Sequence, residues 1–179
     1  MTGIVIIGAG HAAGQAAASL RQAKFEGPIT IIGDEAHVPY QRPPLSKQYL
    51  AGTQLANKVY LRAEKFYADK DIQLMLDTRA TQIDPSTKTI NLCNGETIAY
   101  EKLLISTGSR PRKLSIEGSD LSGIHYLRTM DDVDGIRAEV KPGANLVIVG
   151  GGYIGLEVAA VGIELGMNVH VLEMEERIL

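Results

Sequence analysis

The chain has 179 residues, of which 45% are hydrophobic and 22% charged, and its formal net charge is −3. This length allows one sizeable core, or one domain and part of a second. The slight acidity argues against a nucleic-acid partner, and no apolar run approaches the roughly 20 residues of a membrane span. The start of the chain lacks the basic region and cleavage site of a signal peptide, so we expect a cytoplasmic protein.

A strand, a glycine turn and a helix are predicted at the start of the chain, in "IVIIGAGHAAGQAAASLRQ" from Ile4. Gly8 permits a tight turn and Gly10 lets a pyrophosphate approach the backbone, while Ala13 keeps the helix close to the strand. The helix N-terminus offers N–H groups and a positive dipole to phosphate. The next strand, "ITIIGD", ends at Asp34, where a carboxylate binds ribose hydroxyls. The pattern therefore predicts a nucleotide-binding βαβ unit.

A stiff segment follows, "PYQRPPLSK" at residues 39–47. Two adjacent prolines fix the backbone and remove two donors immediately before Leu45, Ser46 and Lys47. From these residues alone, a surface lysine in the first turn of a helix is the more ordinary interpretation. The stiffness nevertheless raises the question of what Lys47 is held against.

The middle of the chain changes from βαβ character to a β-rich pattern. A helix is predicted at 63–70, a strand at 71–76 and a meander at 78–100, broken by turns at Asp84-Pro85 and Asn94-Gly95. "KLLISTGSRP" predicts a buried strand that ends in a turn at Thr107-Gly108. Cys93 is the single cysteine, so a disulfide framework and a thiol–disulfide pair are both excluded, and a semi-buried strand position is expected for it.

A second βαβ unit is predicted near the end of the chain, after a helix at 129–140 with Thr129 as its N-cap. "LVIVGGGYIGLEVAAVGIELG" carries the complete glycine pattern at Gly150, Gly152 and Gly155. The following strand ends at Glu173, whose carboxylate would accept hydrogen bonds from an adenosine 2′-hydroxyl and repel a 2′-phosphate. NADH is therefore favoured over NADPH, the alternative being that Glu173 is a solvated strand end.

The two units predict an α/β fold of two Rossmann-like domains, with a β-meander in the first. We assign residues 1–112 to an FAD-binding domain and 113–179 to an NAD-binding domain. The second domain is expected to be truncated, because a Rossmann half needs further strands to bury its sheet. Two nucleotide sites in one chain indicate a resident flavin and a nicotinamide that exchange a hydride.

Five phrases of the sequence together resemble one family: "IVIIGAGHAAGQAA", "IIGDEAHVPYQRPPLSKQYLAG", "LLISTGSRPR", "YLRTMDD" and "VIVGGGYIGLEVAA". They are similar to the FAD-dependent, NADH-using ferredoxin reductases of bacterial oxygenase systems, which belong to the wider pyridine nucleotide-disulfide oxidoreductases. The resemblance implies FAD and NADH as cofactors and a small iron–sulfur protein, ferredoxin or rubredoxin, as electron acceptor. It departs from the wider group in one respect, because "PPLSK" stands where the classical members carry a redox-active cysteine pair.

The resemblance also implies roles for individual residues. Ser46 and Lys47 would enter a short helix, with Lys47 directed at the flavin N5 edge and paired with Glu157; these two are the expected catalytic residues. A helix-N-terminal acid favoured by the dipole is the alternative for Glu157. The expected FAD-binding residues are Gly8, Gly10, Ala12, Ala13, Asp34, Arg42, Lys47, Ala80, Thr107, Gly108 and Arg128. Those expected to bind NAD are Gly150, Gly152, Tyr153, Ile154, Gly155 and Glu173.

Several alternatives remain open at this point. Arg42 and Arg128 are also plausible as ordinary surface arginines, and the histidines show no metal spacing, so no metal site is assigned. Within the same fold, the NADH module of a nitrite reductase or a monodehydroascorbate-type reductase would look similar. A non-catalytic FAD- or NAD-binding protein, resembling apoptosis-inducing-factor proteins, is the rival from another class. The identity of the acceptor and the oligomeric state are not predicted.

Overall fold

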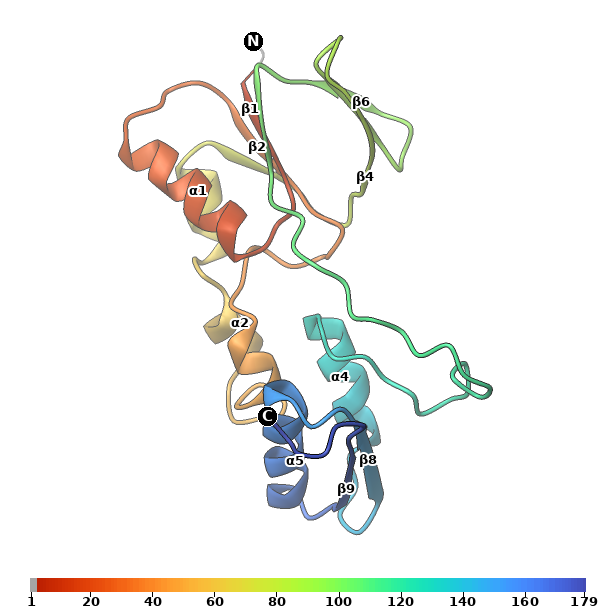
Figure 1. Ribbon diagram of the computed structural model, residues 1–179. Helices are drawn as coiled ribbons and strands as arrows, with labels where there is room; N and C mark the ends of the chain where they lie inside the picture. The colour runs from red at the N-terminus through yellow and green to blue at the C-terminus, as the bar shows by residue number, and fades with distance from the viewer. Residues whose placement is uncertain (1–2) are drawn as a thin grey trace. The chain divides into compact units, whose positions relative to one another are not determined.

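A computed structural model describes residues 3–179 (Figure 1). The chain forms two compact units. The first consists of the chain up to Gln41 together with Tyr60–Ser109, and the second of Arg42–Val59 together with Arg110–Leu179. Each unit contains one of the two predicted βαβ motifs, which confirms the α/β class.

A four-stranded parallel sheet forms the centre of the first unit. Its strands are β1 (Ile4–Ile7), β2 (Ile29–Ile32), β3 (Ile72–Met75) and β7 (Lys102–Ile105), in the order β3-β2-β1-β7. Helix α1 (His11–Gln22) connects β1 to β2, and α3 (Glu64–Asp69) precedes β3, as predicted. The crossover through α1 and the β-branched residues of β1 and β2 match what a parallel sheet requires.

The two faces of this sheet are covered by different elements, because successive side chains of a strand point to opposite sides. On one face Ile6 packs with Ala13 and Ala17 of α1. On the other face Val5 and Ile7 pack against the predicted meander. The meander consists of three antiparallel strands, β4 (Ala80–Asp84), β5 (Thr89–Leu92) and β6 (Thr97–Ala99), drawn in green in Figure 1. Apolar residues at every position of β1 are thus explained by burial on both faces.

Two burial predictions in the first unit are wrong. Strand β7 was expected to be buried, yet Ile105 is 60% exposed, because β7 is an edge strand that pairs with β1 alone. Cys93 was expected to be semi-buried in a strand, but it is exposed and lies just after β5 ends.

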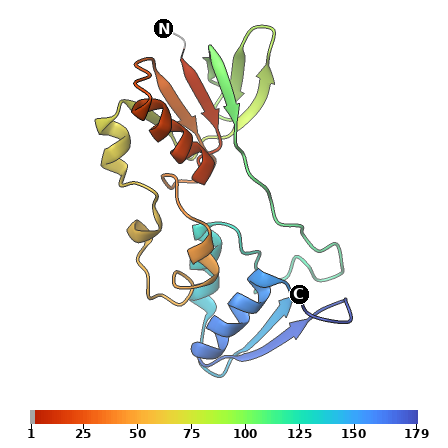
Figure 2. The ribbon, with the colours of Figure 1, turned by 60° about the vertical axis from the view of Figure 1, so that its left-hand side comes forward.

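The second unit is built around α5 (Tyr153–Glu164) and the parallel strands β8 (Asn145–Val149) and β9 (Asn168–Leu172). Gly162 brings α5 close to the strands, since a Cβ there would lie 2.7 Å from Leu146. Figure 2 shows α5 lying along one face of this two-stranded sheet. On the other face Val147 and Val149 are 56% and 62% exposed.

The second unit also contains the proline segment and two further helices. They are the 3-10 helix η1 (Pro43–Ser46), α2 (Ala56–Val59) and α4 (Met130–Glu139). Both α4 and α5 contact η1. The prediction that Thr129 caps α4 is confirmed: its hydroxyl accepts a hydrogen bond from the Asp132 N–H, and the Asp132 side chain accepts one from the Thr129 N–H.

None of the helices formed by residues 3–179 combines the length and the apolar character that a membrane-spanning helix needs.

Candidate functional site

The first glycine turn joins β1 to α1 and leaves room for a ligand. Gly8 has φ +102°, and a Cβ on it would lie 2.3 Å from the Ser106 carbonyl oxygen, so only glycine fits there. Gly10 is the N-cap of α1 in an extended conformation, no side chain caps the helix, and no atom lies within 4 Å of where its Cβ would be. The first N–H groups of α1 lack partners within the helix, as the N-terminal groups of any helix do. This open, positively polarised turn fits a pyrophosphate.

Of the other residues expected at the FAD site, Arg42, Lys47 and Arg128 lie in the second unit, and the rest lie in the first. Ala12 is exposed in the first turn of α1, whereas Ala13 is buried against the sheet. Thr107 and Gly108 follow β7, and the Thr107 Cα lies 2.9 Å from where a Gly8 Cβ would be, so these two turns are in contact. Asp34 follows β2 and Ala80 begins β4.

The second glycine turn repeats this geometry between β8 and α5. Gly150 has φ +111°, and space around both Gly150 and Gly152 is open, with no atom within 4 Å of either ideal Cβ. Gly155 fills the third role of the pattern, because a Cβ on it would lie 2.1 Å from the Gly150 carbonyl oxygen. Tyr153 and Ile154 open α5, and their side chains are 76% and 55% exposed.

Glu173 follows β9 directly, and its side chain turns back to the second glycine turn. Its Oε2 accepts a hydrogen bond from the Gly151 N–H at 2.6 Å, and its Oε1 accepts from the N–H groups of Met174 and Glu175. These backbone hydrogen bonds, led by that from Glu175, lower the pKa of Glu173 below its usual value. An ionised carboxylate therefore stands beside the turn.

Lys47 and Glu157, the two residues expected to be catalytic, meet within the second unit. The Lys47 Nζ lies 2.7 Å from Oε2 of Glu157, and it also donates to the Pro43 carbonyl oxygen at 3.3 Å. The hydrogen bonds from Lys47 and then from Ser46 lower the pKa of Glu157. One detail of the expectation is wrong: Lys47 does not enter a helix but follows η1 as its C-terminal cap, because η1 already begins at Pro43.

The structure brings Arg42 and Arg128 together, a contact that the sequence analysis did not predict. The Arg42 Nη1 donates to the carbonyl oxygen of Arg128 at 2.5 Å. Sequence reasoning also missed a second contact of this segment, in which the Tyr49 hydroxyl donates to the Asp134 carboxylate at 3.0 Å. Both contacts join residues 85 or more positions apart, and no local pattern encodes such a pairing.

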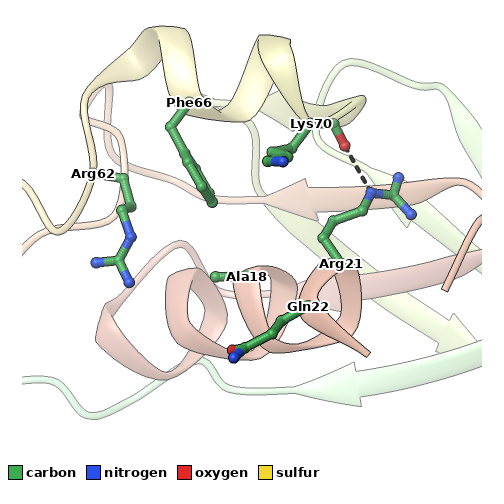
Figure 3. A pocket seen from close by; sticks show the side chains of 6 residues that line it. All are labelled: Ala18, Arg21, Gln22, Arg62, Phe66 and Lys70. Atoms are coloured by element: carbon green, nitrogen blue, oxygen red, sulfur yellow. Dashed lines mark hydrogen bonds between the residues drawn. The ribbon is translucent and has the colours of Figure 1, made fainter. Parts of the chain in front are cut away.

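A shallow hollow of about 300 Å³ lies in the first unit between α1 and α3 (Figure 3). It is lined by Ala18, Arg21, Gln22, Arg62, Phe66 and Lys70, none of which belongs to the expected nucleotide sites. The Arg21 side chain donates hydrogen bonds to four backbone carbonyl oxygens. Its Nε donates to Lys70 at 2.7 Å, and its terminal nitrogens donate to Phe25, Gly27 and Asp71. Its role is therefore to tie the end of α1 to the end of α3.

Across residues 3–179, no group of three or more His, Cys, Asp or Glu side chains is placed to hold a metal ion.

Comparisons with known proteins add to this geometry. The family described as pyridine nucleotide-disulphide oxidoreductase matches residues 2–179. The chain is 43% identical to a probable ferredoxin reductase of Castellaniella defragrans, over 98% of this chain and 43% of the relative. It is 42% identical to a rubredoxin-NAD(+) reductase of Pseudomonas putida, over 98% of this chain and 46% of that protein. The chain thus spans less than half the length of these relatives.

A solved structure agrees with the sequence relatives. The reductase in the covalent putidaredoxin reductase–putidaredoxin complex superimposes with a TM-score of 0.91 at 39% identity, covering 99% of this chain and 43% of that chain.

Proposed function

The chain belongs to the pyridine nucleotide-disulphide oxidoreductase family, and from that premise we propose that it serves an FAD-dependent enzyme that takes hydride from NADH and passes electrons to a small iron–sulfur protein. The observation that carries the proposal is the Lys47–Glu157 pair, in which Nζ and Oε2 are 2.7 Å apart. This pair lies in the same unit as the second glycine turn, and a charged lysine near a dinucleotide site is suited to stabilising negative charge that develops there.

FAD, when bound, supplies the chemistry that a protein side chain cannot, because it accepts a hydride and releases electrons one at a time. Gly8, Gly10 and the start of α1 would hold its pyrophosphate, with Asp34 on the adenosine ribose and Ala80, Thr107 and Gly108 beside it. Arg42 and Arg128 would contribute positive charge. Pro43 and Pro44 restrict the backbone that leads to Lys47, so the chain before the lysine has little conformational freedom.

The NADH site would be formed by the second glycine turn, with Tyr153 and Ile154 at its edge. The Glu173 carboxylate supports a preference for NADH, because the lowered pKa keeps it negative beside the place where an adenosine ribose would lie. A 2′-phosphate at that place would meet like charge.

The electron acceptor is proposed from the chemistry of the relatives. Two of the similar proteins are named for ferredoxin and rubredoxin, and the superimposed reductase is joined to putidaredoxin. Cys93 is the single cysteine, so electrons have no cysteine pair in this chain to pass through.

We place FAD binding in residues 1–112 and NAD binding in 113–179, and we keep the cytoplasm as the proposed location.

Three steps of one experiment test this function. The purified protein should be yellow with bound FAD, lose that colour when NADH is added without oxygen, and then reduce an added ferredoxin or rubredoxin. Bleaching by NADH without transfer to any iron–sulfur protein would contradict the proposed acceptor. Nucleotide binding without bleaching would contradict the enzyme and support the non-catalytic alternative.

A further inference from the structure

Two hydrogen-bond donors from consecutive residues meet on one oxygen of Glu157. The Ser46 hydroxyl lies 2.5 Å from Oε2, and the Lys47 ammonium lies 2.7 Å from the same atom. The two donors differ in freedom of movement. Ser46 has a short side chain and is 4% exposed, whereas the Lys47 side chain is long and 41% exposed. A buried hydroxyl therefore sets where the carboxylate sits more firmly than a flexible ammonium can.

Ser46 is itself held by contacts that do not involve Glu157. It ends η1, which starts with two prolines, and the following residues are fixed to α4. The Tyr49 hydroxyl donates to Asp134, while the Arg137 guanidinium lies over the Tyr49 ring at 5.7 Å from its centroid. The Ser46 hydroxyl therefore reaches α5 from a segment whose position is fixed by other contacts.

Resting on the proposed function, we propose that Ser46 is a positioning residue: its hydroxyl holds the Glu157 carboxylate in the orientation that keeps the Lys47 ammonium in place for hydride transfer. Lys47 alone would form an exposed ion pair with many geometries of similar energy, since half-exposed pairs of this kind are weakly restrained. With Ser46 bonded to the same oxygen, the carboxylate has a fixed orientation and Lys47 has a fixed partner. Ser46 therefore acts through Glu157 and needs no contact with either nucleotide.

The test compares Ser46→Ala with the parent protein through two measurements. The first is a pH titration of the Glu157 carboxyl by ¹³C NMR, with the signal assigned from Glu157→Gln; Ser46→Ala should raise the pKa, because one donor to the ionised form is lost. The second is the rate of flavin bleaching by NADH in the FAD-bound protein, which should fall roughly tenfold with little change in NADH affinity. Ser46→Thr retains a hydroxyl and should restore both values.

Two controls separate positioning from a general loss of a buried group. Ser86→Ala removes a hydroxyl that donates to the Asp84 carboxylate at 2.6 Å in the first unit, and it should leave the bleaching rate unchanged. In a double-mutant cycle, Ser46→Ala should have almost no further effect on the rate in a Glu157→Gln background, because the carboxylate that it positions is already gone.

Two results would overturn the proposal. One is an unchanged pKa of Glu157 in Ser46→Ala, which would mean that Ser46 only packs against its neighbours. The other is a rate loss of the same size in both backgrounds, because Ser46 would then act independently of Glu157. Should the parent protein not bleach with NADH at all, the proposed function fails, and the NMR titration still decides whether Ser46 holds the carboxylate.

Discussion

The two glycine turns share a backbone design but differ in what surrounds them. In the first unit Gly8 is pressed against Ser106, and the sheet behind it is covered on both faces. In the second unit the space beside Gly150 is open, and the nearby side chains carry charge: Glu173 bonds to the turn and Glu157 bonds to Lys47. The position in α1 that matches Glu157, 142 residues earlier, is the neutral Gln15, which donates to Ser19.

The difference suggests a division of tasks between the two turns. A tightly packed turn suits a cofactor that stays bound, because it is built into the core of its unit. The charged groups beside the second turn suit a redox reaction, because they place a lysine–carboxylate pair where charge changes during the reaction.

Replacing the first glycine of each turn by alanine should separate packing from backbone strain. Gly8→Ala meets both a positive φ and a carbonyl oxygen 2.3 Å away, so it should lower the free energy of unfolding by roughly 3 kcal/mol. Gly150→Ala meets only the positive φ and should cost roughly 1 kcal/mol. Denaturant unfolding followed by circular dichroism measures both. Equal losses would remove the packing difference on which the comparison depends; Gly10→Ala, in open space with an extended backbone, is the control expected to fold normally.

Removing Lys47 should show that the lysine–carboxylate pair of the second unit takes part in the reaction, whereas a similar pair in the first unit does not. Lys47→Ala should retain FAD but slow its bleaching by NADH about 100-fold, the range seen when one stabilising group is removed from a transition state. The matched control is Lys65→Ala, which breaks the Lys65–Asp69 pair of the first unit, whose nitrogen–oxygen distance is 2.8 Å against 2.7 Å for Lys47–Glu157. Stopped-flow absorbance measures both rates. If the two variants bleach alike, Lys47 has no part in hydride transfer.

Much of this arrangement follows from the sequence, and the reasons are local. The glycine turns are encoded in fewer than ten residues each, and the Thr129 cap depends on a residue three positions away. Burial was harder to predict, because an apolar run such as "KLLI" looks the same in a central strand and in the edge strand β7. The Ser46–Glu157 and Tyr49–Asp134 contacts join positions 111 and 85 apart, so they depend on how α4 and α5 pack on η1.

Charge at the end of β9 should determine which nicotinamide nucleotide is used. The double variant Glu173→Ala, Met174→Arg exchanges a carboxylate for a neutral group and adds a guanidinium at a side chain that is 97% exposed. It should raise the NADPH/NADH ratio of kcat/KM by roughly tenfold or more. In the first unit Asp34→Ala should reduce the FAD content and leave that ratio unchanged. If the NADPH/NADH ratio changed in Asp34→Ala and not in the Glu173 variant, the first turn would bind the nicotinamide nucleotide and the second turn FAD.

The start of α4 provides a contrast to the starts of α1 and α5. No side chain caps α1 or α5, whereas the Thr129 hydroxyl accepts a hydrogen bond from the Asp132 N–H of α4. Thr129→Ala should therefore lower the free energy of unfolding by about 1 kcal/mol without changing nucleotide binding. Thr129→Ser keeps the hydroxyl and should retain most of the stability. A change in NADH affinity in the alanine variant would mean that the α4 cap also supports the ligand site.

As the pH falls, the Lys47–Glu157 pair of the second unit should weaken before the hydrogen bonds of the Asp84 carboxylate in the first unit do. The pKa of Glu157 is lowered from 4.5 by Lys47 and Ser46, so its stabilising contribution is complete above pH 4.5 and is lost as the pH falls through the folded-state value. Asp84 in the first unit has a pKa of about 2, held down first by the Ser86 hydroxyl, so its contribution persists to lower pH. The stability difference between the parent protein and Glu157→Gln, measured by urea unfolding, should be constant from pH 7 to pH 5 and shrink below pH 4.5. The corresponding difference for Asp84→Asn should persist over that range, and a Glu157 difference independent of pH would show that the carboxylate's charge is not what binds Lys47.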